Sequence, residues 1–265
     1  MFRKKKVVWL LLLPGLAGLM LFYVVPFFGG IYSSLMDGSF ENQFVGLANY
    51  ERTLQNSMFQ LGLKNTWELS LLCAPVIWLL AFLLAAMLKT LKDRSTAFRN
   101  ILLLPYLMPS IAVGVAFFIL FSTEKLNLFN TYTLLIIVGT VKYIPFASRS
   151  SLNSMLQLSG EIEEAAIIQD VPWIKRMTRI IIPIQKSSII SGFLLPFMTC
   201  LRELSLFMLL CVQGFILSTT LDYFDEMGLY AFSSGINLIL IVTILVCNTL
   251  VNKITGASLD KGIGG

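Results

Sequence analysis

The stretch Glu163-Glu164-Ala165-Ala166-Ile167-Ile168-Gln169-Asp170 decides how the chain is interpreted, because it is a polar, helix-forming interruption between two strongly apolar regions. Pro172 follows and breaks any helix there, so the sequence predicts two short helices that meet near Asp170. We interpret residues 160–179, here called the coupling segment, as a water-exposed surface for another protein. Ile168 and Trp173 would be its apolar anchors in a groove of that partner. The alternative is an ordinary loop whose basic residues contact lipid head groups.

The composition places most of this 265-residue chain in a membrane. Hydrophobic residues make up 56% of the sequence and charged residues 13%, whereas soluble domains average about 45–50% and about 25%. A helix needs about 20 apolar residues to cross a hydrocarbon core of about 30 Å, and a mean hydropathy of +0.79 is typical of several such spans. We therefore expect an all-α, multi-pass protein of the bacterial plasma membrane, with residues 1–265 forming one domain.

The residue types that are missing exclude most enzyme chemistry. The chain has no histidine, which removes the commonest general base and metal ligand. It has no G-x-x-x-x-G-K-[ST] phosphate loop, so we expect no ATPase site, no cofactor and no metal in this chain. Four cysteines lie far apart in or beside apolar runs, which favours core packing over a disulfide or a zinc site. They are Cys73, Cys200, Cys211 and Cys247.

Six apolar spans account for the length of the chain. They cover residues 7–28, 67–88, 101–121, 132–146, 180–211 and 234–251. Pro105 and Pro109 predict a kinked or unwound start of the third span, and the fifth span is too long for one straight crossing. The net charge of +5 comes largely from basic residues at span ends, a pattern of membrane orientation rather than of nucleic-acid binding. Six spans place both termini and the coupling segment, between spans four and five, in the cytoplasm.

Several polar side chains fall within the predicted spans. Arg202 and Glu203 lie in the fifth span, where a charge is costly and normally faces a cavity or a partner. They are candidates for the lining of a translocation path or for a gate, and the alternative is a structural ion pair near the outer interface. Asn237 in the sixth span is a further path candidate, or a bond between helices. Lys142 and Arg149 are expected to anchor the cytoplasmic end of the fourth span.

The coupling segment resembles the signature of permease subunits in binding-protein-dependent ABC importers. That signature is Glu-Ala-Ala, three residues, Gly, nine residues, Ile, one residue, Leu and Pro. The matching residues here are Glu164, Ala165, Ala166, Ile180 and Pro183, with Ile182 in place of Leu and Asp170 in place of Gly. Glycine permits a positive φ, and aspartate tolerates that conformation better than most residues, so we expect the turn to survive.

Other segments resemble two different branches of the same family. Residues 44–50, 64–66 and 98–109 look like the carbohydrate branch. Residues 202–205 and 255–258 are similar to permeases for ferric iron or phosphorylated solutes. Together these resemblances cover nearly the whole chain, and they leave the substrate open between the two branches.

The resemblance implies a role and a set of partners. The chain would be half of a solute path, paired with a second permease subunit, two cytoplasmic ATPases that bind ATP and Mg²⁺, and an extracytoplasmic solute-binding protein. Residues 163–170 would dock into an ATPase. The most favoured substrate is a carbohydrate or a carbohydrate phosphate, and ferric iron or another anionic solute is the alternative. An ATP-independent carrier or channel is a third hypothesis of a different class.

Overall fold

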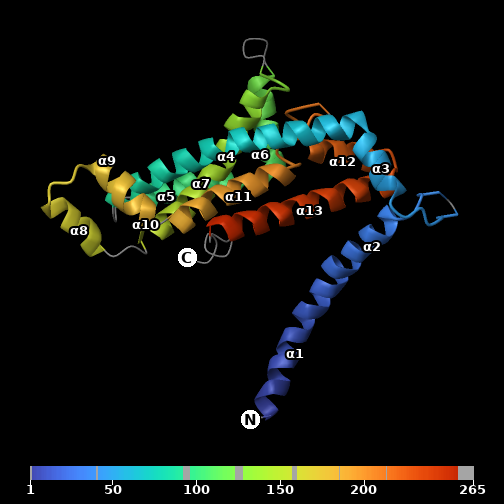
Figure 1. Cartoon of the computed structure of the whole chain (residues 1–265), viewed down its shortest axis with the longest axis horizontal. Helices are drawn as coiled ribbons and strands as arrows, with labels where there is room; N and C mark the ends of the chain where they lie inside the picture. Colours follow the sequence, from blue (N-terminus) through green and yellow to red (C-terminus); the bar gives the residue numbers. More distant parts are fainter. Residues whose placement is uncertain are drawn as a thin grey trace. The chain divides into compact units, whose positions relative to one another are not determined.

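The computed structural model describes residues 2–39, 41–91, 96–122, 128–156, 160–184, 186–212 and 214–255. Residues 92–95, in the basic stretch between the second and third predicted spans, and the tail after Thr255 lie outside the described residues. The helices, labelled in Figure 1, are α1 (Phe2–Leu19), the π-helix η1 (Met20–Val24), α2 (Val25–Ser34), α3 (Ala48–Gln55), α4 (Ser57–Leu91), α5 (Thr96–Leu107), α6 (Ser110–Phe121), α7 (Tyr132–Leu156), α8 (Gly160–Ile168), α9 (Trp173–Arg176), the π-helix η4 (Met177–Ile181), α10 (Ile182–Ile184), α11 (Lys186–Arg202), α12 (Leu217–Glu226) and α13 (Tyr230–Thr255).

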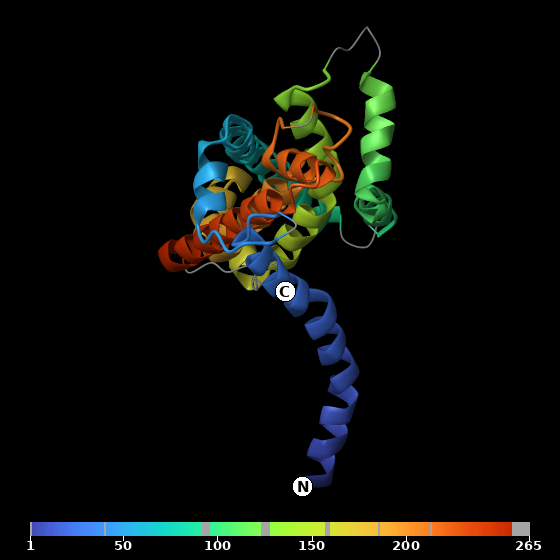
Figure 2. The same cartoon turned by 90° about the vertical axis from the view of Figure 1, so that its right-hand side faces the viewer.

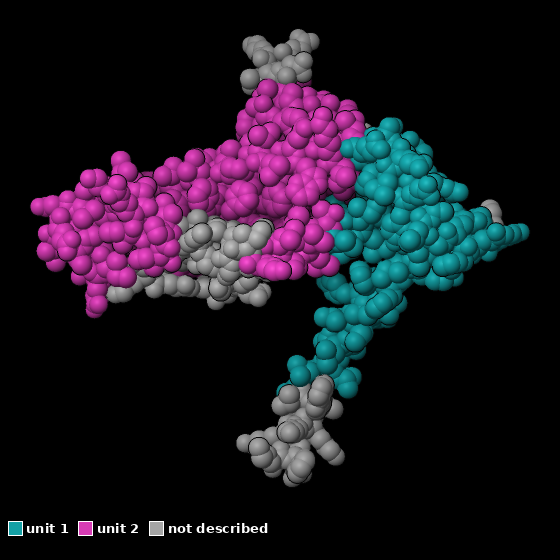
Figure 3. Space-filling model, viewed as in Figure 1, with its two compact units in different colours: residues 1–60, 221–242 teal, residues 61–220, 243–265 magenta. Residues whose placement is uncertain are grey.

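The predicted all-α fold is confirmed. Across the described ranges, extended residues pair only in an isolated antiparallel bridge between Met36 and Phe44. The chain divides into two compact units (Figure 3): unit 1 comprises residues 1–60 and 221–242, and unit 2 comprises residues 61–220 and 243–265.

Unit 1 contains a long apolar helix and a small polar cluster. Helices α1, η1 and α2 follow one another without a break, and side chains such as Leu11 and Phe22 are exposed along them. At the end of α2 the buried Asn49 amide of α3 donates hydrogen bonds to the carbonyls of Ser34, at 2.9 Å, and Met36, at 2.6 Å. These two bonds satisfy carbonyls that the end of the helix leaves without partners. They fix α3 against α2.

Unit 2 is organised around α4 and α7. The first residues of α4 belong to unit 1, where Asn56 caps the helix: its Oδ1 accepts the backbone N–H of Phe59 at 3.0 Å. This cap lets the helix start ten residues before the predicted span of 67–88. Helix α7 packs against α5, α6 and α11, and it continues to Leu156, ten residues beyond the predicted end of the fourth span. Residues 150–156 are therefore helical rather than part of a polar loop.

The main core of unit 2 is formed by α4, α7 and the irregular segment of residues 203–216. Leu69, Leu135, Phe207 and Leu210 are fully buried in it. Cys73, Cys200 and Cys211 are also buried there, as the sequence predicted for core cysteines.

The predicted fifth span ends earlier than expected. We predicted an apolar span over residues 180–211, but α11 stops at Arg202, and turns follow before α12 begins at Leu217. The reason is local: the Glu203 carboxylate accepts the backbone N–H of Leu206 at 3.0 Å, which stabilises a turn in place of the next helical bond. Between the fifth and sixth predicted spans the chain forms α12, a helix that was not predicted from the sequence.

Three helical segments are long and apolar enough to cross a membrane, namely Leu11–Ser34, Ser57–Lys89 and Tyr230–Leu250. A fourth is formed if Asn100–Leu107 and Ser110–Phe121 count as one broken span; their axes differ by 95°. Figure 2 shows α6 turned away from α5 at this break. The kink predicted from Pro105 and Pro109 is thus confirmed. These are the candidate spans among the described residues, and the six-span topology stays a prediction.

Candidate functional site

The coupling segment, residues 160–179, is a pair of short helices joined by a tight turn. Helix α8 ends in two hydrogen bonds: the N–H of Asp170 donates to the carbonyl of Ile167 at 2.9 Å, and that of Val171 donates to the carbonyl of Ala166 at 3.0 Å. This pair of bonds is a Schellman motif, which satisfies the last carbonyls of a helix. Pro172 then precedes α9 in an extended conformation. The predicted two-helix arrangement with a break at Asp170 is confirmed.

Asp170 occupies the position of the turn that requires a positive φ. Its φ is 51°, and the residue at this position of a Schellman motif is usually glycine, because a Cβ atom disfavours left-handed backbone. Aspartate is one of the few other residues that adopt this conformation. The turn therefore survives the replacement of glycine, as the sequence analysis expected.

The coupling segment presents a largely exposed apolar surface. Ile168 is 83% exposed, Ile174 68% and Trp173 44%, and all three flank the turn. Ala166 on the opposite side of α8 is buried. Exposed apolar side chains grouped in this way mark a site of interaction with another molecule. Glu164 and Ala165 are exposed on the same short helix.

A salt bridge connects the coupling segment to α4. The Nζ atom of Lys89 lies 2.6 Å from Oε2 of Glu163, and each side chain is only about a quarter exposed, at 26% and 24%. Lys89 stands in the last turn of α4, where a cation also interacts favourably with the negative end of the helix. Sequence analysis proposed Glu163 for the coupling segment but did not identify its partner, because 74 residues separate the two.

A second connection follows α9 along the chain. In η4, Met177 and Ile181 pack into a buried cluster with Phe82 of α4 and Leu152 and Met155 of α7. A π-helical turn widens the helix and is frequent at functional sites. In η4, Ile180 is half-buried, and Pro183 in α10 is exposed. The coupling segment is therefore anchored to the ends of two long helices by one charged contact and one apolar contact.

The three predicted path residues belong to two different units. Glu203 lies just after α11 in unit 2, where its carboxylate accepts hydrogen bonds from the Tyr143 hydroxyl and the Leu206 amide. Arg202 is the exposed last residue of α11. Asn237 is exposed on the part of α13 that belongs to unit 1.

One of the two predicted anchors is buried instead. Lys142 is only 4% exposed, and its ammonium donates to backbone carbonyls at the end of α5. The anchor role expected of Lys142 is wrong, because its ammonium is buried inside the fold and bound by these carbonyls. Arg149, two turns further along α7, is exposed.

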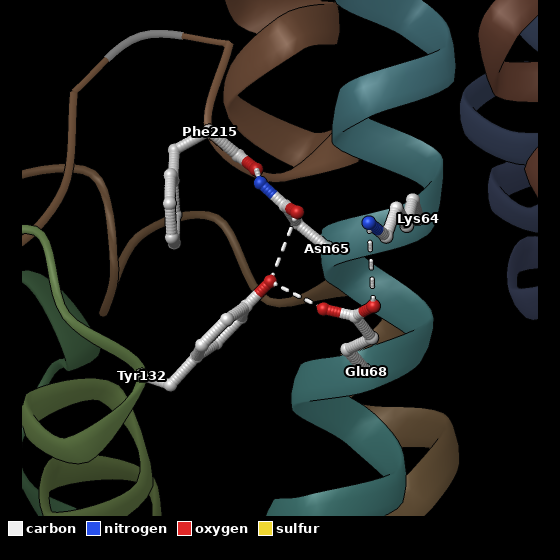
Figure 4. A network of polar contacts seen from close by, with 5 residues as sticks. All are labelled: Lys64, Asn65, Glu68, Tyr132 and Phe215. Carbon is white, nitrogen blue, oxygen red and sulfur yellow. Dashed lines mark hydrogen bonds and ion pairs between the residues drawn. The ribbon is translucent and has the colours of Figure 1, made fainter.

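A polar network joins the beginnings of α4 and α7 (Figure 4). The Tyr132 hydroxyl lies 2.9 Å from both Asn65 Oδ1 and Glu68 Oε2, and the Asn65 amide donates to the carbonyl of Phe215 at 2.7 Å. Lys64 pairs with Glu68 at 3.8 Å, near the surface. The network holds the segment before α12 against α4 and α7. Sequence reasoning missed it, because the contacts join residues that are 64 to 150 positions apart.

Apolar helices of membrane length, with an exposed helix pair fixed to two of the long helices, define a multi-pass membrane protein. The chain belongs to the family of binding-protein-dependent transport system inner membrane components, whose model matches residues 77–259. It is thus a multi-pass, inner-membrane permease subunit of the ABC importer type.

Individual relatives agree with this assignment. The trehalose/maltose transport system permease protein MalF of Thermococcus litoralis is 25% identical over an alignment of 273 positions, which covers 92% of each chain. The arabinooligosaccharides transport system permease protein AraP of Bacillus subtilis is 24% identical over an alignment of 298 positions, which covers 98% of this chain and 92% of AraP. In the solved structure of a bacterial alginate ABC transporter with its alginate pentasaccharide-bound periplasmic protein, one chain has the same fold, with a TM-score of 0.77, 18% identity and 97% of each chain covered.

Proposed function

We propose that this chain forms half of the translocation path of an ATP-driven importer and that the coupling segment receives the movement of a cytoplasmic ATPase. A second permease subunit, similar or identical, supplies the other half of the path. Two ATPases bind ATP and Mg²⁺, and an extracytoplasmic binding protein delivers the solute. Membrane lipid surrounds the spans, and no nucleic acid takes part.

The observation that carries this proposal is the exposed apolar surface of the coupling segment. Side chains such as Ile168 and Ile174 gain by leaving water, and their rigid Schellman turn presents them in a fixed geometry. A short helix pair with apolar anchors fits a groove on a partner. Trp173 adds the type of large side chain that is enriched where interfaces are strongest.

The two connections of the coupling segment give the mechanism. The bridge from Lys89 to Glu163 transmits a pull on α8 to α4. The buried contacts of Met177 and Ile181 transmit a pull on α9 to α4 and α7. When ATP closes the ATPases, these helices rock and the path opens outward in an alternating-access cycle. Such coupling requires that the ATPase binds the two permease states with different affinity.

We assign six spans to the chain, with both termini in the cytoplasm. The described helices that support this assignment are the segment 11–34, α4, the bent pair α5–α6, α7, α11 and α13. Three of these pass the length and hydropathy requirement singly, and the bent pair passes it jointly. The positive-inside rule then places residues 89–100 and the coupling segment in the cytoplasm.

We propose a carbohydrate or a carbohydrate phosphate as the solute. The names of MalF and AraP and the alginate-bound transporter complex support this substrate class. Arg202, Glu203 and Asn237 are the proposed path or gate residues. Uptake by vesicles with a purified binding protein tests the substrate class: retention of labelled oligosaccharide supports it, and retention of ferric iron instead overturns it.

A charge reversal on α8 tests the coupling role. Glu164→Lys is expected to leave the chain inserted in the membrane while transport and copurification of the ATPase fall at least tenfold. Glu51→Lys, an exposed carboxylate on α3, is the matched control and is expected to retain both. Unchanged transport in Glu164→Lys, or uptake by this chain alone in pure vesicles, would indicate an ATP-independent carrier or channel and would overturn the proposal.

A further inference from the structure

The bend between α5 and α6 exposes backbone carbonyls that the helix itself cannot satisfy. In a continuous helix the carbonyl of Pro105 would accept the N–H of residue 109, but that residue is Pro109, which has none. The chain turns by 95° there, so the carbonyls of Tyr106 and Met108 also leave the helical pattern. In the hydrocarbon region of a membrane, where no water is available, an unsatisfied backbone group is strongly unfavourable.

Lys142 of α7 supplies the missing donors. Its Nζ atom donates to the carbonyl of Pro105 at 3.0 Å, to that of Tyr106 at 3.3 Å, and to that of Met108. An ammonium group has three protons, and three carbonyls accept them here. A cation is also favoured at the negative end of α5. The side chain is buried and lies about 15 Å from the start of α7, at about 1.5 Å per residue.

Neighbouring side chains of α7 strengthen the same contact and add a second one. The rings of Tyr106 and Phe146 stack at a centroid distance of 5.3 Å, which holds the end of α5 on α7. Tyr143, the residue after Lys142, donates its hydroxyl hydrogen bond to Glu203 at the end of α11. Ser218 of α12 also donates to the Glu203 carbonyl at 2.7 Å. Two consecutive residues of α7 thus bind two different breaks in the helical structure.

We propose that Lys142 and Tyr143 form a clasp on α7 that fixes the α5–α6 bend and the C-terminal end of α11 to one helix, so that these elements move as one body. Both are positioning residues. The use of this motion in transport rests on the proposed function, whereas the clasp itself does not. The coupling segment is anchored to α4 and α7, so a movement that reaches α7 is carried by the clasp to both breaks.

Spin labels across the bend test the Lys142 half of the clasp without a transport assay. Cysteines replace the exposed Ile101 of α5 and Ile119 of α6 in the full chain, with Cys247→Ser in the background. Pulsed electron paramagnetic resonance is expected to give one narrow distance distribution between the two labels when Lys142 is present. Lys142→Met is expected to broaden it and add a longer distance. Arg149→Met, which removes an exposed cation of the same helix, is the control and is expected to leave it narrow.

A second variant keeps the test decisive if Lys142→Met does not accumulate. Pro109→Ala in the same chain restores an N–H for the Pro105 carbonyl, so the double variant is expected to accumulate with a straightened α5–α6 pair and a longer distance. A narrow 101–119 distance distribution at the parent distance, in either variant, would show that the bend persists without Lys142 and would overturn the proposal. Tyr143→Phe is expected to broaden the distance from Ile119→Cys to Met208→Cys; if that distance stays narrow, Tyr143 is no part of the clasp.

Transport measurements separate this proposal from the transport function itself. In vesicles with binding protein and ATPases, Lys142→Met is expected to lower the solute imported per ATP at least fivefold, with ATPase copurification unchanged. A normal ratio together with a broadened bend would overturn the role of the clasp in transport. If the parent protein imports nothing but shows the narrow bend that Lys142→Met loses, the transport function is wrong and the clasp stands.

Discussion

The ammonium of Lys89, at the end of α4, lies 2.6 Å from the carboxylate of Glu163 in α8. The two residues are joined through space across 74 positions of sequence, and about three quarters of each side chain is shielded from water. The contact gives the coupling segment a charged link to a membrane-length helix, beside the apolar link that Met177 makes with the ends of α4 and α7.

Reversing the charge of one partner of this salt bridge is expected to weaken coupling. Exchanging the two charges between Lys89 and Glu163 is expected to restore it. Lys89→Glu or Glu163→Lys alone places like charges together and is expected to cost about 1 kcal/mol, which is roughly a fivefold change in an equilibrium. ATP-dependent uptake is then expected to fall several-fold. The double variant Lys89→Glu with Glu163→Lys is expected to recover most of the uptake. If its loss of uptake equals the combined losses of the two single variants, the link between the two residues is refuted.

The positive φ of Asp170 predicts how variants at this position rank in their affinity for the ATPase. Asp170→Gly is expected to match or exceed the parent in ATPase affinity, because glycine adopts a positive φ without a steric cost. Asp170→Val is expected to lower the affinity about fivefold or more, since left-handed backbone costs a residue with a Cβ about 1–2 kcal/mol. Titration of the ATPase into the reconstituted permease measures this, and equal affinities for the glycine and valine variants would contradict it.

Gly114 of α6 is expected to be intolerant of even a methyl group. A Cβ atom there would lie 2.9 Å from the backbone oxygen of Leu206, and overpacking of this kind costs about 1–3 kcal/mol. Gly114→Ala is therefore expected to lower the melting temperature in detergent. Gly29→Ala, where a Cβ meets nothing within 4 Å, is the matched control, and a similar loss in both variants would argue against the packing explanation.

The loop after α2 is expected to loosen in acid. Hydrogen bonds from the Ser39 side chain and backbone, together with the backbone of Gln43, hold the pKa of Asp37 below its ordinary value of 3.8. A lowered pKa means that the ionised form stabilises the loop, so this contribution is complete above the ordinary value and is lost as pH falls through the lower one. The protection of the Ser39 and Gln43 amides from hydrogen exchange, relative to the intrinsic rate at each pH, is expected to fall below about pH 4. Asp37→Asn is expected to show low protection at every pH, and protection that stays unchanged in acid in the parent protein would contradict this.

Features that depend on neighbouring residues in the sequence were predictable. The break after α8 follows from Pro172 and from the turn position of Asp170, and the α5–α6 bend follows from Pro105 and Pro109. Features that depend on tertiary contacts were not. The role of Lys142 is an example, because the carbonyls that it binds lie 34 to 37 positions earlier. The early end of α11 likewise depends on the turn that the Glu203 carboxylate stabilises. In the sequence, Glu203 lies within one long, largely apolar segment, so the turn was not predicted.

The measurement that tests the central claim most directly is site-specific crosslinking from Ile168, the most exposed apolar side chain of the coupling segment. A photoreactive amino acid at this position, in the complete membrane assembly, is expected to capture the ATPase subunit with a yield that changes between the nucleotide-free and ATP-bound states. Capture of lipid alone, in both states, would contradict the account.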